Sequence, residues 1–154
     1  MNRSQRLRQW VFARHSHPVS ASTRLITTPL VVAPFWTRRA DVAVGVLVWL
    51  AVNPIMTPEP TQRNSFATRA ILGEERWLAH RDLDRTMSAV NVIGTIFLGG
   101  SVLAAQQRRK LPTALGVAAT MALTLYGWRR YAEVYESDRK PDSVMPDRRH
   151  TVSR

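Results

Sequence analysis

The clearest signal in the chain is the run Met87-Ser-Ala-Val-Asn-Val-Ile-Gly-Thr-Ile-Phe-Leu-Gly-Gly-Ser-Val-Leu-Ala-Ala105. It lies inside an uncharged interval of 22 residues, 86–107. A helix needs roughly 20 mostly apolar residues to cross the hydrocarbon core of a bilayer. The run therefore predicts a membrane-spanning helix near 86–106.

Three further uncharged intervals flank this run, with 13, 17 and 18 residues: 25–37, 42–58 and 111–128. We predict hydrophobic helices near 24–37, 41–57 and 112–129, the first of them short or re-entrant because Pro29 and Pro34 lack a backbone N–H. A soluble protein would need amphipathic helices to cover these segments, and the rest of the chain offers few. The predicted fold class is an all-α integral membrane protein with about four hydrophobic helices.

The basic residues indicate how these helices are oriented, in a chain whose net charge is +11. If all four helices cross, 17 Lys and Arg share one side with both termini, and five lie opposite: 38, 39, 108, 109 and 110. If the first does not cross, the split becomes 10 against 12. Because Lys and Arg are retained on the cytoplasmic side, the count favours four spans with both termini cytoplasmic.

Two segments are expected at the membrane surface. Leu7, Trp10 and Val11 share one face of an Arg-rich stretch, which suits a helix lying on anionic lipid, or alternatively a mitochondrial presequence. Phe66 to Leu83 carries an apolar stripe and predicts an interfacial helix near 66–83. The resulting division is a basic segment 1–23, a membrane domain 24–131 and a polar tail 132–154 that we expect to be disordered.

Composition excludes several kinds of chemistry. The chain has no cysteine, so disulfides, thiolate catalysis and Cys-based metal centres are ruled out. No charged residue or histidine lies inside an apolar interval, which argues against a proton-coupled transporter or a haem held within the bilayer. We therefore expect no cofactor, although a small permease-like protein remains an alternative.

Small and amide side chains within the apolar intervals are candidates for helix packing. Asn53 and Asn91 are amides that hydrogen-bond across helices, either as packing contacts or as a polar pair at a substrate site. Two stripes at four-residue spacing let helix backbones approach closely, so the last two helices pack on each other or on another copy of the chain. These stripes are Asn91, Thr95 and Gly99, and Gly116, Thr120 and Thr124.

Titratable side chains gather at two places. Glu74, Glu75 and His80 are candidate acid–base residues for an interfacial enzyme acting on a lipid-like substrate. The simpler interpretation is a surface helix on which His80 lies four residues from Asp84. The histidines at positions 15 and 17 are candidate metal ligands without a nearby third ligand, and the simpler interpretation is a helix end.

These observations predict a non-catalytic membrane component, with the interfacial enzyme as an alternative. The expected partners are membrane lipids, anionic by charge complementarity, and a second copy of the chain or another membrane protein. We expect no nucleic-acid partner, because soluble nucleic-acid binding would rest on net charge alone.

Several phrases occur in an order that resembles a known family. They are Arg14-His15-Ser16-His17-Pro18, Ser22-Thr-Arg24, Thr28-Pro29-Leu30, Val52-Asn53-Pro54, and Thr68-Arg-Ala-Ile-Leu-Gly-Glu74 with Trp77. The set, over residues 10–130, resembles an uncharacterised family of short prokaryotic multi-pass membrane proteins, known only as a domain of unknown function. The resemblance implies a multi-pass membrane protein and supplies no activity, ligand or site. The expected location is the prokaryotic plasma (inner) membrane. The first phrase has His17 where asparagine would be expected.

Overall fold

A computed structural model describes residues 6, 10, 14–53, 56–58, 60, 64–80 and 84–137. Its elements, all of them helices, are α2 (Pro18–Ile26), the 3₁₀ helix η1 (Thr28–Val32), α3 (Ala33–Thr37), α4 (Ala40–Val52), α5 (Phe66–Ala79), α6 (Thr86–Gln106) and α7 (Lys110–Ser137). The predicted all-α class is confirmed over the residues that the structure describes. Apart from residues 6, 10 and 14, the expected surface helix of the basic N-terminal segment lies outside this range, as does the predicted tail beyond residue 137. Residues 132–137, which the sequence predicts to belong to that disordered tail, are part of α7.

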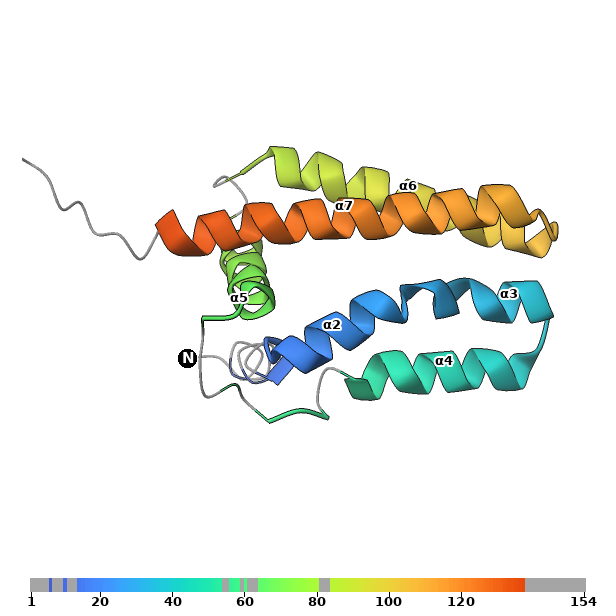
Figure 1. Ribbon diagram of the computed structural model, residues 1–154, viewed down its shortest axis with the longest axis horizontal. Coiled ribbons are helices and arrows are strands. Elements are labelled where there is room, and N and C mark those ends of the chain that lie inside the picture. Colours follow the sequence, from blue (N-terminus) through green and yellow to red (C-terminus); the bar gives the residue numbers. More distant parts are fainter. Residues whose placement is uncertain are drawn as a thin grey trace, which may run out of the picture.

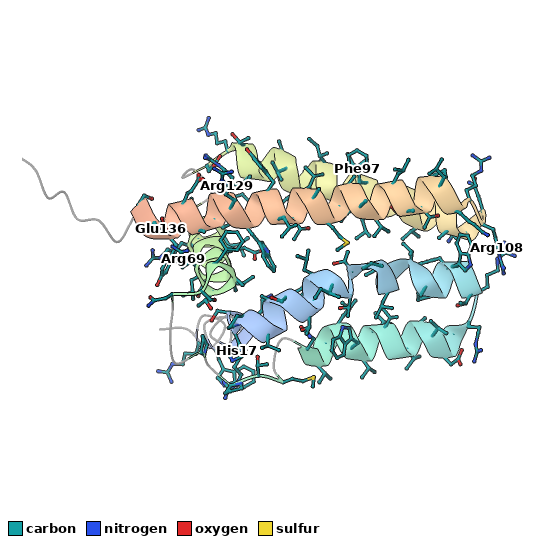
Figure 2. The ribbon with its side chains drawn as sticks, in the orientation of Figure 1. His17, Arg69, Phe97, Arg108, Arg129 and Glu136 are labelled. Atoms are coloured by element: carbon teal, nitrogen blue, oxygen red, sulfur yellow. The ribbon has the colours of Figure 1, made fainter. Side chains whose placement is uncertain are left out.

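The helices form two antiparallel hairpins that lie alongside each other (Figure 1). In the first, α2, η1 and α3 run out and α4 returns; in the second, α6 runs out and α7 returns. Both turns place an arginine in the left-handed backbone region, Arg38 with φ 55° and Arg108 with φ 57°. We call the end with these turns the tip, and the opposite end the base. Figure 2 shows Arg108 at the tip, and His17, Arg69, Arg129 and Glu136 at the base.

The two tips are joined directly. The guanidinium of Arg38 donates a hydrogen bond of 3.0 Å to the backbone carbonyl of Gln106, one of the last carbonyls of α6. Such carbonyls have no partner within their own helix, so a side-chain donor satisfies one of them. The first hairpin therefore reaches as far along the molecule as the second.

The outgoing arm of the first hairpin is irregular, as the prolines predict. The hydroxyls of Thr27 and Thr28 donate to carbonyls of the preceding turn, which lets the chain pass from α2 into the 3₁₀ helix. The arm begins earlier than the predicted residue 24, because the imidazole of His17 caps α2 and Pro18 occupies its first position. The predicted boundary between residues 23 and 24 thus falls inside α2.

Three other predicted helix ends differ from the structure. Helix α4 ends at Val52 and not near 57, since Pro54 has no backbone N–H with which to continue the helix beyond its cap Asn53. Helix α5 ends at Ala79, short of 83, with His80 as its cap. Helix α7 continues past 129 to Ser137, because Glu133 pairs with the arginines one turn earlier and the aromatic residues beyond them pack on α5.

Helix α5 lies across the base, against α7 and α2 (Figure 1). It meets α7 at Gly73, where an added Cβ would overlap the carbonyl of Tyr131. Trp77 packs on the ring of Tyr131 with centroids 5.6 Å apart, and donates from its indole nitrogen to the carbonyl of Asp84 at 2.8 Å. Asp84 in turn accepts from Arg130 of α7 at 2.8 Å. These contacts fix α5 as a crossbar over the ends of the helices.

The outer surfaces of the hairpins are apolar and exposed. None of the residues of α4 is buried, and Leu47 is 65% exposed. On α6, Ile96 is 66% exposed, and Figure 2 shows Phe97 on the outer side of the second hairpin. By length and composition α6 and α7 could each cross a membrane. Helix α4 is also apolar but shorter.

Candidate functional site

A cavity of about 460 Å³ lies between the two hairpins, and α5 forms part of its wall at the base. Its volume is in the range of sites that hold small molecules, about 300–1,000 Å³. Every long helix contributes to its lining: His15, Arg24, Leu25, Thr28, Val31, Leu50, Ile71, Glu74, Asn91, Leu98, Thr120, Thr124 and Trp128. The lining combines ionisable side chains from the base with aliphatic side chains from nearer the tip.

Arg24 and His15 meet in the wall of this cavity. The Arg24 guanidinium lies 3.1 Å from Nε2 of His15. Because arginine only donates, Nε2 must accept, so the neutral imidazole carries its proton on Nδ1. Burial, and then the charge of Arg24, lower the pKa of His15 to about 4. His15 is therefore a neutral side chain at physiological pH, and its Nδ1 is buried without a hydrogen-bond partner in the described residues.

Glu74 brings a carboxylate to the same wall. It lies on the face of α5 that also carries the buried Ile71, and both side chains line the cavity. Burial raises the pKa of Glu74, and the positive charge of Arg24 opposes that effect. Among the described residues we find no hydrogen bond or ion pair for this carboxylate. The cavity thus holds an acidic group whose bonding capacity is unused.

The deeper part of the cavity is less polar. The amide of Asn91 donates to the hydroxyl of Tyr131 at 2.8 Å. Thr120 and Thr124 donate to carbonyls of their own helix at 2.9 Å, which satisfies their hydroxyl protons. A smaller space of about 180 Å³ between α6 and α7 shares these residues. The cavity is therefore amphipathic, with charged groups at the base and a largely satisfied wall beyond them.

The predicted acid–base cluster is divided by the structure. Glu74 lines the cavity, whereas His80 is exposed at the end of α5 and does not line it. Glu75 is adjacent to Glu74 but falls on another face of the helix, outside the lining. The interpretation of His80 and Asp84 as helical neighbours is wrong, because α5 ends at Ala79 and Asp84 pairs with Arg130.

The two candidate metal ligands have different partners. His15 contacts Arg24, whereas Nδ1 of His17 accepts from the N–H of Val19 at 3.3 Å as the cap of α2. Over the described residues no group of three or more acidic, cysteine or histidine side chains could hold a metal ion.

The candidate packing residues have unequal surroundings. Asn53 is 4% exposed and joins α4 to α2, donating 2.9 Å to Thr23 and accepting from Ser20. Gly116 meets α6 at Ser101, which an added Cβ would overlap, and Thr120 donates at 3.5 Å to the carbonyl of Gly94. The stripe on α6 is different, because an added Cβ at Gly99 would meet nothing within 4 Å and Thr95 is exposed.

Sequence reasoning missed Arg24, because it considered the arginine only as a charge bounding an apolar interval. A signal was nevertheless present. His15, Arg24 and Glu74 belong to three of the ordered phrases that carry the family resemblance. The fold brings those three phrases together at one end of one cavity.

These features define an all-α protein with two helices long and apolar enough to cross a membrane and an amphipathic cavity between two hairpins. The chain belongs to DUF6653, a family of unknown function, whose sequence pattern matches residues 1–148. The match is longer than the predicted resemblance over residues 10–130. No curated protein and no solved structure matches the chain.

Proposed function

We propose that this protein is a prokaryotic inner-membrane protein that crosses the bilayer four times, with both termini cytoplasmic. We propose further that it binds a small amphipathic molecule in the central cavity without transforming it. The observation that carries the binding role is the unpartnered Glu74 carboxylate beside Arg24 and His15 in the cavity wall.

The exposure of the apolar helices supports a membrane location. A core helix of a soluble protein is mostly buried, yet the apolar window is 11% buried in α6 and 22% buried in α7. Leaving a large apolar side chain in water forgoes about 1.5–3 kcal/mol relative to burying it. Exposed side chains of this kind cover the outer faces of five elements, α2, η1, α4, α6 and α7: Ile26, Leu30, Val44, Leu47, Val48, Val92, Ile93, Ile96, Leu103, Leu111, Leu115 and Leu125. The hydrocarbon core of a bilayer would surround these side chains in place of water and so remove that cost.

The contact between Arg38 and Gln106 supports four spans over a re-entrant first hairpin. If α6 crosses the bilayer, Gln106 emerges on the far side, and the first hairpin must emerge there too because Arg38 bonds to its carbonyl. Residues 18–37 give the outgoing arm ample length. Helix α4 has 13 residues and spans about 20 Å, so local thinning of the bilayer and extended arginine side chains at the tip accompany it.

The distribution of basic residues then sets the orientation. The base holds the start of α2, the end of α7 and the helix α5, and the tip holds Arg38, Arg39 and 108–110. Lys and Arg accumulate on the cytoplasmic side, which supports the proposal that the base faces the cytoplasm. The charged end of the cavity then lies at the cytoplasmic interface and its aliphatic end lies in the hydrocarbon region.

The ligand class follows from the groups that remain available. Arg24 offers donors and Glu74 offers an acceptor, and the wall beyond them mixes aliphatic side chains with threonine and asparagine side chains that already donate within the protein. A single-chain amphiphile whose head both donates and accepts hydrogen bonds matches this lining. Catalysis is not proposed, because His15 is already bonded to Arg24 and His80 lies outside the cavity.

Cysteine labelling tests the topology, since the chain contains no native cysteine. In a bacterial inner membrane, Arg38→Cys and Arg108→Cys should react with a membrane-impermeant maleimide in intact cells. Asn64→Cys should react only after permeabilisation. Protection of position 38 alongside labelling of position 108 would contradict four spans. Free labelling of Ile96→Cys from water would contradict a membrane location.

Native mass spectrometry of the purified protein tests the binding role. The chain should carry a small amphiphile that is lost in Arg24→Gln and in Glu74→Gln. Arg129→Gln is the matched control, since Arg129 is exposed at the base and does not line the cavity. An unoccupied native protein, or equal occupancy in all four proteins, would exclude this role.

Association through α6 is a second candidate role. It is favoured by the stripe of Asn91, Thr95 and Gly99 on α6, where a second helix could approach Gly99 without steric conflict. Gly99→Leu should weaken self-association measured by chemical cross-linking in bilayers, with Gly45→Leu on the exposed face of α4 as the control. Unchanged cross-linking in Gly99→Leu would eliminate this surface.

A further inference from the structure

A second hollow in the molecule lies away from the central cavity. It is an open groove of about 560 Å³ between the outgoing arm of the first hairpin and the tip half of α7. Its walls are almost entirely apolar, with Val32 and Trp36 on one side and Val117 and Met121 on the other. Ala114 and Ala118 form part of the α7 wall, and such small side chains leave room for an occupant.

The groove has one cationic end. Lys110 lines it, and the neighbouring turns add Arg38, Arg108 and Arg109 at the same tip. The acidic side chain closest in sequence, Asp41, is paired with Arg39. Among the described residues, no acidic side chain forms an ion pair with Lys110, Arg38, Arg108 or Arg109. An apolar groove thus ends at a cluster of positive charge that has no acidic partner.

The length of the groove matches one leaflet. Along α7 it runs from Lys110 to Met121, which is about 16 Å at the rise of an α-helix. The hydrocarbon core of a bilayer is about 30 Å thick, so half of it is about 15 Å. A lipid in the leaflet next to the tip would place its headgroup at Lys110 and one acyl chain along the groove.

We propose that this groove binds an anionic glycerophospholipid of the tip-side leaflet, with its phosphate on Lys110 and Arg108 and an acyl chain between the hairpins. Charge complementarity selects the anionic headgroup, and the apolar walls select the chain. The inference depends on the membrane location proposed above but not on the ligand of the central cavity.

Trp36 allows a direct test, because its indole lines the groove. The full chain is reconstituted in phosphatidylcholine vesicles that contain a small fraction of brominated phosphatidylglycerol or brominated phosphatidylcholine. The quenching assigned to Trp36 is the difference between the native chain and Trp36→Phe. We expect the brominated anionic lipid to quench Trp36 about fivefold more effectively per molecule than the brominated zwitterionic lipid.

Two variants and their controls separate the headgroup from the chain. Lys110→Gln with Arg108→Gln should abolish the preference, and Arg129→Gln with Arg85→Gln, an equal charge change at the base, should keep it. Ala118→Phe, which fills the groove, should abolish quenching by both lipids, and Ala122→Phe, on an exposed part of α7 outside the groove, should not.

The outcomes distinguish this site from the membrane assignment. A chain that does not float with vesicles overturns both. A chain that floats but is quenched equally by the two lipids, or keeps its preference in Ala118→Phe, overturns the lipid site alone. Quenching that falls as the protein-to-lipid ratio rises would assign the groove to a second copy of the chain and would also overturn the lipid site.

Discussion

Gly73 of α5 lies against the backbone of Tyr131 in α7, so closely that a single added methyl group would overlap the Tyr131 carbonyl oxygen. The obstacle is backbone rather than a flexible side chain, so it cannot move aside without shifting α7. The closest approach of the crossbar α5 to the bundle therefore requires glycine. Glu74, the next residue, is carried to the cavity by this approach.

Gly73→Ala should lift α5 from α7 and destabilise the protein by about 3 kcal/mol, at the upper end of the usual cost of overpacking. Thermal unfolding in detergent, followed by circular dichroism, would measure the loss. Gly99→Ala is the matched control, because its added methyl meets nothing within 4 Å. Equal stability of the two variants would contradict a close approach of α5 to α7 at Gly73.

The pair of Asp84 and Arg130 should make stability depend on pH. Burial raises the pKa of Asp84, but the hydrogen bonds and charge of Arg130 outweigh it and hold the pKa below the ordinary value of 3.8. A depressed carboxyl pKa stabilises the fold above the ordinary value, and this contribution is lost as pH falls through the folded-state pKa. Asp84→Asn should therefore cost about 1–3 kcal/mol at neutral pH and progressively less below pH 3.8.

The exposed pair of Arg39 and Asp41 provides the control for that measurement. Both side chains are about two-thirds exposed, at 65% and 64%, whereas Asp84 is 9% exposed. Exposed ion pairs contribute about 0–1 kcal/mol. If Asp41→Asn destabilised the fold as much as Asp84→Asn, the burial of Asp84 would not make its ion pair with Arg130 stronger than an exposed ion pair.

His15 predicts a second, separate pH dependence. Its pKa falls from 6.5 to about 4 on folding, so the unfolded chain binds more protons between those values. Stability should consequently decrease as pH is lowered through this window, by at most about 1.4 kcal/mol per pH unit. His15→Gln, which keeps an acceptor for Arg24, should remove this slope, and His17→Gln should keep it. The readout is the free energy of unfolding at several pH values, and an unchanged slope in His15→Gln would exclude His15 as its source.

Uninterrupted apolarity made the second hairpin predictable. The predicted helix near 86–106 coincides with α6, because charged residues bound it on both sides and no proline interrupts it. The start of the first hairpin depends on local capping by His17 and Pro18, which lie outside the charge-free interval 25–37. The extension of α7 to Ser137 depends on its packing against α5, which is a long-range contact.

The site was predictable only in part, for a similar reason. The sequence singles out Glu74 as a candidate acid–base residue but predicts that its partners are Glu75 and His80, its neighbours in sequence. Helix geometry turns Glu75 to another face, and the end of α5 removes His80. The residues that share the cavity with Glu74, including His15 and Arg24, come from a distant part of the chain. Without the hairpin arrangement, nothing in local spacing connects them.

The two membrane amides should differ in importance, although sequence reasoning treated them alike. Asn53 is buried and connects α4 to Thr23 and Ser20 of α2, whereas Asn91 is exposed and makes one bond to Tyr131. Asn53→Ala removes two hydrogen bonds from a buried site, the one donated to Thr23 and the one accepted from Ser20, and should cost about 1–3 kcal/mol. Asn91→Ala should cost about 0.6 kcal/mol, the average for a hydrogen bond between membrane helices. Unfolding titrations in mixed micelles would rank them, and a larger loss for Asn91→Ala would mean that the first hairpin is held by its apolar contacts and not by this amide.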